Sequence, residues 1–215
     1  MRRARTDHAK EQRRGAILRA ATSLLDRSRY DTVTMAAVAR EAGIAKGTTY
    51  LYFATKEQLF LALLEEEYAA WFGDARVALR ALPADPDLGA VRDALVGTVK
   101  DRPRFLELMQ LLHGVLEQNI PMETARAFKT RLRDEVTGLA LVLSEVTAMP
   151  MPRAGRLLMH LHAVVIGLRQ LARPSAPVEE ALERPDLAVM RVDFEEELRV
   201  VLLDLLRSAA REESA

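Results

Sequence analysis

Apolar residues recur at three- and four-residue steps along most of the chain, which is the period of an amphipathic helix. In the segment from Asp7 to Leu25, these positions are Ile17, Leu18, Ala21, Leu24 and Leu25. No segment alternates apolar and polar residues for long enough to predict a strand, and no Asn-Gly pair marks a hairpin. The pattern therefore predicts an all-α protein.

Capping residues predict two short helices in the first part of the chain. Thr34 can cap a helix over Met35–Ala42, and Gly43 can end it because glycine adopts the left-handed conformation of a tight turn. A second helix is expected over Lys46–Leu51. Two such helices form a helix-turn-helix, a unit that in many proteins places its second helix in the major groove of DNA.

A long helix is expected to begin at the capping box formed by Thr55 and Gln58. Its predicted inner face consists of Leu59, Phe60, Leu63, Leu64, Tyr68 and Trp71. The stretch Pro83–Asp87 then breaks the helical pattern. Further helices are expected over residues 88–100, 103–118, 121–149, 152–172 and 194–211, with a surface loop at residues 174–177.

The segment GIAKGTTYLYFATKE, residues 43–57, concentrates side chains that suit DNA. Lysines can pair with phosphates, threonines offer hydroxyl and methyl groups to base edges, and tyrosines offer phenol groups to phosphates. The expected contacts are Lys46, Gly47, Thr48, Thr49, Tyr50, Tyr52 and Lys56, with Gly47 allowing close approach of the backbone. Each also has an ordinary explanation as a capping, core or solvent-exposed residue.

Charge is unevenly placed along a chain whose formal net charge is zero. The first 60 residues hold 12 Lys+Arg and 6 Asp+Glu, whereas the remaining residues hold 19 and 25. A basic N-terminal part on an acidic body suggests a polyanionic partner, with a chance distribution of surface charge as the alternative.

Composition removes several classes of function. The absence of cysteine excludes disulfides, thiolate metal sites and a cysteine nucleophile. The N-terminal residues carry no apolar segment of the kind found in secretory signals. The longest uncharged apolar run, Leu157–Leu168, is well short of the ~20 residues that span a bilayer. A soluble cytoplasmic protein without membrane partners is therefore expected.

Catalytic and metal chemistry find little support in the sequence. His160 and His162 are two residues apart, so on a helix they diverge and cannot chelate one ion. Runs of three glutamates scatter around a helix axis, and no nucleophile and base pair stands out. We expect no enzymatic activity, metal site or cofactor. A helical enzyme or a protein-interaction module without specific DNA binding is the alternative.

The run TMAAVAREAGIAKGTTYLYFATKEQLFLALLEE, residues 34–66, resembles the DNA-binding domain of tetracycline-repressor-type (TetR family) transcriptional regulators. The likeness extends back through AKEQRRGAILRAATSLLDRSRYDTV and covers about residues 10–65. Its most specific part is KGTTYLYF followed by a Thr-Lys-Glu helix start. No motif beyond this region matches the family.

The resemblance implies a repressor that binds operator DNA as a homodimer and releases it when a small molecule binds the C-terminal domain. It implies a three-helix helix-turn-helix domain, residues 1–56, and a larger helical effector-binding and dimerisation domain, residues 57–215. The implied DNA contacts are Thr34, Lys46, Thr48, Thr49, Tyr50, Tyr52 and Lys56, with Gly43 and Gly47 structural. Arg2, Arg3 and Arg5 could form an arm that reaches DNA, but they precede the matching region.

Two late segments, residues 157–168 and 198–206, are apolar on nearly all sides. A helix of this kind must bury two faces, one against its own core and the other against a partner, unless it lies wholly inside the domain. The first explanation predicts a dimer interface of four helices, two from each chain. Its expected residues are Leu161, Val165, Leu168, Leu198, Leu202 and Leu205.

The middle helices are expected to enclose the effector. Methionines are numerous there, and methionine fills adaptable apolar space, although it is often ordinary core. Polar residues that could orient a ligand among apolar walls are Gln110, His113, Asn119, His160 and Arg169. An apolar or amphipathic effector is therefore expected.

Overall fold

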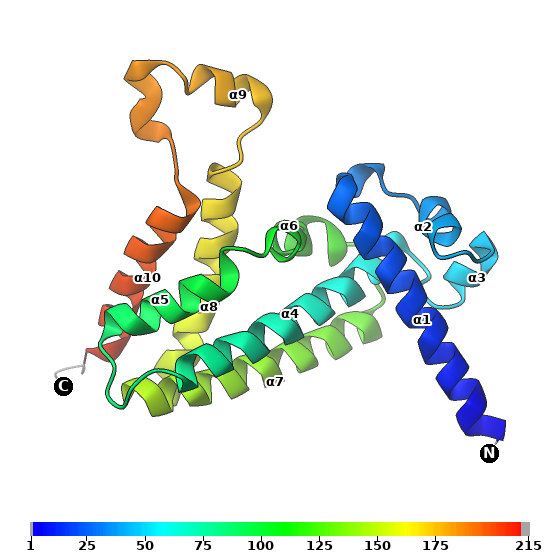
Figure 1. Ribbon diagram of the computed structural model, residues 1–215, viewed down its shortest axis with the longest axis horizontal. Helices are drawn as coiled ribbons and strands as arrows, with labels where there is room; N and C mark the ends of the chain where they lie inside the picture. Colours follow the sequence, from blue (N-terminus) through cyan, green and yellow to red (C-terminus); the bar gives the residue numbers. More distant parts are fainter. Residues whose placement is uncertain (1, 212–215) are drawn as a thin grey trace. The chain divides into compact units, whose positions relative to one another are not determined.

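All regular elements in the described part of the chain are helical, as the computed structural model in Figure 1 shows. The structure describes residues 2–211, and the side chains of residues 2–7 lie outside the description, including those of Arg2, Arg3 and Arg5. The all-α prediction is confirmed. The α-helices are α1 (Arg2–Arg27), α2 (Met35–Glu41), α3 (Lys46–Tyr50), α4 (Lys56–Arg80), α5 (Leu88–Val99), α6 (Pro103–Leu111), α7 (Met122–Thr147), α8 (Met151–Leu171), α9 (Ala176–Ala181) and α10 (Phe194–Ala210).

Three shorter elements complete the described part of the chain: the 3₁₀ turns η1 (Tyr30–Thr32) and η3 (Pro185–Met190) and the π-helical turn η2 (Leu112–Leu116). Two segments depart from the sequence pattern. The helix expected over residues 103–118 changes to π-helical hydrogen bonding after Leu111, and the surface loop expected at residues 174–177 gives way to α9 at Ala176. Proline in the first turn of α9 needs no N–H partner, so it permits a helix to start there.

The chain forms two compact units. The first comprises Met1–Glu67 and Leu111–Lys129, and the second comprises Tyr68–Gln110 and Thr130–Ala215. Helix α4 therefore contributes its first half to one unit and its second half to the other. The division into residues 1–56 and 57–215 stays a prediction.

The first unit is built on the inner faces of α1, α2 and the start of α4. Ile17 and Leu18 of α1 and Val38 of α2 are almost fully buried, and so are Leu59 and Phe60 of α4. The apolar spacing predicted four of these positions, Ile17, Leu18, Leu59 and Phe60. Burying such side chains stabilises the unit by about 1.5–3 kcal/mol each before conformational entropy is counted.

Tyr30 connects the turn after α1 to the beginning of α4. Its ring is 6% exposed and lies edge-on to Phe60, with 5.0 Å between ring centroids. The Lys56 ammonium lies 3.8 Å from the centre of the Tyr30 ring, and its Nζ donates a hydrogen bond of 2.5 Å to the Tyr30 carbonyl. A cation over a ring face and a charge-assisted hydrogen bond together fix where α4 starts.

The second unit contains an aromatic cluster made by Tyr68, Trp71 and Phe72 of α4 and Phe105 of α6. All four rings are buried. Their polar atoms find partners: the Tyr68 hydroxyl lies 3.2 Å from Nδ1 of His162, and the Trp71 indole N–H donates to Thr98 at 3.2 Å. The cluster is therefore a satisfied core.

Helix α10 packs against α8 and α5 in the second unit, as Figure 1 shows. Its buried face carries Leu198, Leu202 and Leu206. Arg199 clamps α10 to α5 through Asp93 at 2.5 Å, and Lys100 pairs with Glu195 at 3.1 Å. The connection holding α9 and η3 leaves from the end of α8 and returns to the start of α10.

Alkaline pH should destabilise the protein through Tyr30. Burial, followed by the charges of Glu57 and Asp31, raises the pKa of Tyr30 from 10.0 to about 12. The unfolded chain therefore loses this proton near pH 10 while the folded chain keeps it, so stability from neutral Tyr30 is present below pH 10 and is lost as pH rises toward 12.

The test compares the free energy of unfolding of the wild type and of Tyr30→Phe between pH 8 and pH 12. The Tyr30 hydroxyl has no hydrogen-bond partner among the described residues, so its removal should stabilise the protein by about 1 kcal/mol at pH 8. The stability difference between Tyr30→Phe and the wild type should grow between pH 10 and pH 12, because only the wild type loses stability there. A stability difference that stays constant across this range would contradict the raised pKa of Tyr30.

Candidate nucleic-acid interface

The turn between α2 and α3 is fixed by backbone hydrogen bonds around Gly43. Gly43 has a φ of +66°, in the left-handed region. The Ile44 N–H donates to the Ala39 carbonyl at 3.0 Å, and the Gly43 N–H donates to the Arg40 carbonyl at 3.2 Å. This pair of bonds is a Schellman motif, which satisfies carbonyls at the end of α2 and sets the direction of the chain into α3.

Side-chain contacts fix both ends of α2. Thr34 caps its N-terminus by accepting a hydrogen bond from the Ala37 N–H at 3.1 Å. At the other end Glu41 pairs with Arg27 of α1 at 2.7 Å and accepts from Ser23 at 2.9 Å. The Arg27 guanidinium, with the Ser23 hydroxyl, holds the pKa of Glu41 below its usual range. Helix α2 is thus attached to α1, and α3 is attached to α2.

Helix α3 separates its polar residues into an outward and an inward set. Lys46 and Gly47 are exposed, Thr48 is half-buried and Tyr50 is 44% exposed. Thr49 is fully buried, and its hydroxyl donates to the Lys46 carbonyl at 2.6 Å. The prediction that Thr49 contacts DNA is therefore wrong for this structure, because its side chain packs inside the unit with its hydrogen bond satisfied.

The exposed side of α3 is open and positively charged. The Lys46 ammonium has no ion-pair partner among residues 8–211, so its charge is available to a phosphate. No atom lies within 4 Å of a Cβ built at Gly47, so the backbone there faces open space. Leu51, which ends α3, is 81% exposed and was not among the predicted contacts. Its position directly after Tyr50 on a short helix is the signal that could have identified it.

The start of α4 adjoins this surface along the chain. The predicted capping box is confirmed: the Gln58 N–H donates to the Thr55 hydroxyl at 3.2 Å, and the Gln58 side chain accepts from the Ala54 N–H at 2.9 Å. Tyr52 is half-buried. Lys56 is held by Tyr30, and burial lowers its pKa. Its role as a phosphate contact stays a prediction.

The five residues predicted to orient an effector are distributed over both units. His113, whose Nδ1 lies 3.1 Å from Glu117, belongs with the exposed Asn119 to the first unit. Gln110, His160 and Arg169 belong to the second unit. Arg169 lies 5.9 Å over the Phe194 ring, and burial lowers its pKa. His160 and Arg169 are nine residues apart, about 13.5 Å along α8, so they do not face one small group. Their roles as effector contacts stay predictions.

The predicted dimer residues divide into core and surface. Leu161, Val165, Leu198 and Leu202 are at most 3% exposed within their own unit. They cannot be contacts to a partner, because the chain's own side chains already cover them, and that part of the prediction is corrected. Leu168 and Leu205 are half-buried. The large apolar residues of α8 and α10 that face outward are Met151, Met159, Leu171 and Val200, which are 39%, 56%, 61% and 54% exposed.

The described residues include no helix long and apolar enough to cross a membrane.

Comparison with known families covers most of the chain. Residues 17–63 match the family described as bacterial regulatory proteins, tetR family, and residues 65–210 match the family described as tetracyclin repressor-like, C-terminal domain. The HTH-type transcriptional repressor KstR of Rhodococcus jostii (strain RHA1) is 38% identical over 63 residues, which cover 29% of this chain and 30% of KstR. The chain thus spans about a third of the length of the curated relatives it matches.

Solved structures resemble the chain over nearly its full length. The fatty acid degradation regulator FadR from Bacillus halodurans has a TM-score of 0.55 at 19% identity, covering 89% of this chain and 94% of its own. The TetR family repressor AlkX from Dietzia sp. strain DQ12-45-1b has a TM-score of 0.56 at 18% identity, with coverages of 92% and 97%. At these identities the likeness shows a shared fold.

Two glycine substitutions should show whether backbone strain or lack of space for a side chain determines the change in the free energy of unfolding. A Cβ meets no atom within 4 Å at either Gly43 or Gly47, and only Gly43 is left-handed. Gly43→Ala should lower the free energy of unfolding by about 1 kcal/mol, because an L-residue is strained there. Gly47→Ala should be neutral or stabilising, because alanine favours helix more than glycine does. Urea denaturation of both variants measures this, and equal changes would contradict the strain argument.

Proposed function

Because the chain belongs to the tetR family of bacterial regulatory proteins, we propose that it is a transcriptional regulator that binds operator DNA as a homodimer and is released by a small-molecule effector. The observation that carries the proposal is the exposed surface of α3. This five-residue helix presents Lys46, Gly47 and Tyr50 outward while Thr49 anchors it inward. The regulator represses its target genes and acts in the cytoplasm, where it meets DNA.

In the proposed complex α3 lies in the major groove. The unpaired Lys46 ammonium contacts a phosphate, and Gly47 lets the backbone approach the DNA closely. Thr48 contacts a base edge with its hydroxyl and methyl groups, and exposed Leu51 adds an apolar contact that suits a thymine methyl. Thr34, Tyr50, Tyr52 and Lys56 surround these contacts and bind the backbone phosphates.

The proposed dimer forms through the outward face of α8, together with Val200 of α10. Gly155, Met159, Ala163, Gly167 and Leu171 recur every four residues and form one ridge of α8. No atom lies within 4 Å of a Cβ built at Gly155 or Gly167. Small residues on a ridge let two helices approach closely, and the flanking Met159 and Leu171 supply apolar area for burial.

The proposed effector is apolar or amphipathic. Two structural neighbours are named for a role in fatty acid degradation and an implication in biodegradation of n-alkanes, both of which concern long apolar chains. The methionine-rich and leucine-rich middle helices of this chain suit the same class. By thermodynamic linkage, an effector that weakens operator binding is itself weakened by operator DNA by the same factor. The proposal assigns the chain no catalytic activity.

DNA binding should depend strongly on salt and on α3. Lys46→Ala should weaken binding to all duplexes and reduce the slope of log affinity against log salt by about 1, because one phosphate contact is lost. Arg207→Ala, which removes an exposed charge from α10, is the matched control and should leave both quantities unchanged.

The two adjacent threonines sharpen the same experiment. Thr48→Val should change base preference, whereas Thr49→Val should lower stability and leave base preference intact, because only the Thr49 hydroxyl is buried against the Lys46 carbonyl. Fluorescence anisotropy with a set of duplexes at several salt concentrations measures both effects. A DNA affinity that does not change with salt concentration would overturn the proposed function.

The dimer face can be tested by two neighbouring substitutions on α8. Ala163 is exposed, so Ala163→Glu should give a folded monomer, because only a partner would bury the new carboxylate. Val165 is 2% exposed, so Val165→Glu should unfold the second unit at any protein concentration. Analytical ultracentrifugation with circular dichroism separates the outcomes, and a folded Ala163→Glu dimer would place the interface elsewhere.

A further inference from the structure

One part of α1, around residues 8–13, stands clear of the rest of the first unit. The side chains of these six residues are all exposed, and six residues make more than one full turn of a helix. No described element therefore covers α1 on any side there. Burial begins further along the helix, at Ile17 and Leu18. Figure 1 shows the start of α1 extending beyond α2 and α3, so this part of the helix is open to a partner.

The open part of α1 continues the buried side of the same helix, but with basic residues. Lys10, Arg13 and Arg14 precede the fully buried Ile17 by seven, four and three residues. Residues at these steps lie on one side of a helix. The side of α1 that packs into the unit from Ile17 onward thus becomes a basic stripe, consisting of Lys10, Arg13 and Arg14, where the helix leaves the unit.

Arg14 places the basic stripe beside the end of α3. Its guanidinium lies 5.5 Å from the centre of the Phe53 ring and 3.9 Å from the Glu66 carboxylate of α4. Phe53 directly follows α3, since its N–H donates to the Thr49 carbonyl at 2.9 Å. Lys10 lies one turn further out, about 6 Å along α1. A major groove is about 12 Å wide, so a helix beside α3 lies close to the phosphates that border the groove.

The first half of α1 has an excess of positive charge whichever of its own side chains pair. Residues 2–14 include six Arg and Lys residues and two acidic residues, an excess of four. Assigning Arg14 to Glu66 of α4 lowers this excess to three. An exposed helix with excess positive charge attracts a polyanion, and phosphates of DNA already lie next to α3 in the proposed complex.

We propose that the basic stripe of α1 binds phosphates of the DNA backbone next to the base pairs that α3 reads. The proposal rests on the proposed function, in which α3 lies in the major groove. Lys10 and Arg13 hold the phosphates, while Arg14 keeps the stripe beside Phe53 and the end of α3. Phosphate contacts carry no sequence information, so the stripe adds affinity and fixes the orientation of the first unit on the duplex.

Salt dependence and phosphate ethylation test the proposal on the full chain, with a duplex that the wild type selects from a random-sequence pool. Lys10→Ala and Arg13→Ala should each reduce the slope of log affinity against log salt by about 1, because one phosphate contact is lost. Alanine favours helix, so α1 should persist in both variants, which circular dichroism checks. Arg19→Ala is the matched control, because Arg19 is exposed on the opposite side of α1 and should leave the slope unchanged.

Ethylation of single phosphates identifies the contacts themselves. Phosphates bound by the stripe should weaken wild-type binding when they are ethylated and should have no effect on the variant that lacks their partner. Lys10→Ala and Arg13→Ala should also leave base preference unchanged, unlike Thr48→Val.

Two results would overturn the proposal while leaving the proposed function standing. The first is salt-dependent binding by the wild type with the same slope and the same ethylation pattern in Lys10→Ala and Arg13→Ala. The second is loss of the dimer in these variants, measured by analytical ultracentrifugation, because the stripe would then be a contact between copies. A wild type that binds no duplex in a salt-dependent way would instead overturn the proposed function, and the stripe proposal with it.

Discussion

A helix of five residues is too short to be stable alone, so the position of α3 depends on the residues that anchor it. The left-handed turn at Gly43 determines how the chain enters α3, and the buried Thr49 side chain holds the helix against the unit. Because the inner face is anchored, Lys46, Thr48 and Tyr50 are presented outward without further support. Their arrangement is therefore as rigid as the three-helix unit around them, which is what reading base edges requires.

The same unit fixes the start of α4 by a contact over a long sequence distance. Lys56 reaches back 26 residues to the carbonyl and ring of Tyr30, and Tyr30 in turn packs on Phe60. Any motion of α4 that separated these groups would leave a partly buried ammonium without its partner. The first turn of α4 is thus held to the turn after α1 through one buried tyrosine.

Helix α8 serves several purposes on different faces. Leu157, Leu161 and Val165 belong to the core of the second unit, whereas Ala163 and Gly167 face outward with small side chains. Arg156 and His160 are exposed as well, and their three-residue steps to Met159 and Ala163 put them on the same outward side. A helix has room for both faces because residues at steps of three and four stay together while others turn away. The core and the proposed dimer contacts therefore use the same helix without using the same residues.

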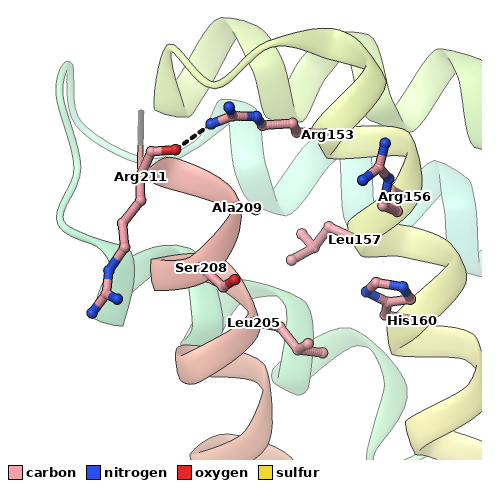
Figure 2. Close-up of a pocket in the computed structure, with 8 residues that line it drawn as sticks. All are labelled: Arg153, Arg156, Leu157, His160, Leu205, Ser208, Ala209 and Arg211. Atoms are coloured by element: carbon pink, nitrogen blue, oxygen red, sulfur yellow. Dashed lines mark hydrogen bonds between the residues drawn. The ribbon is translucent and has the colours of Figure 1, made fainter. Parts of the chain in front are cut away.

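Interactions within about four residues explain what could be read from the sequence. The helical class, the Thr34 cap, the turn at Gly43 and the capping box at Thr55 are all local, and the structure confirms them. Sequence also identified the segment that carries the candidate DNA contacts. Burial is different, because it depends on which distant residues cover a side chain. Only the tertiary structure shows that Thr49 is fully buried whereas Thr48 is not, and that Leu161 and Val165 belong to the core. It also brings residues near 156 and 208 together around one groove, which Figure 2 shows.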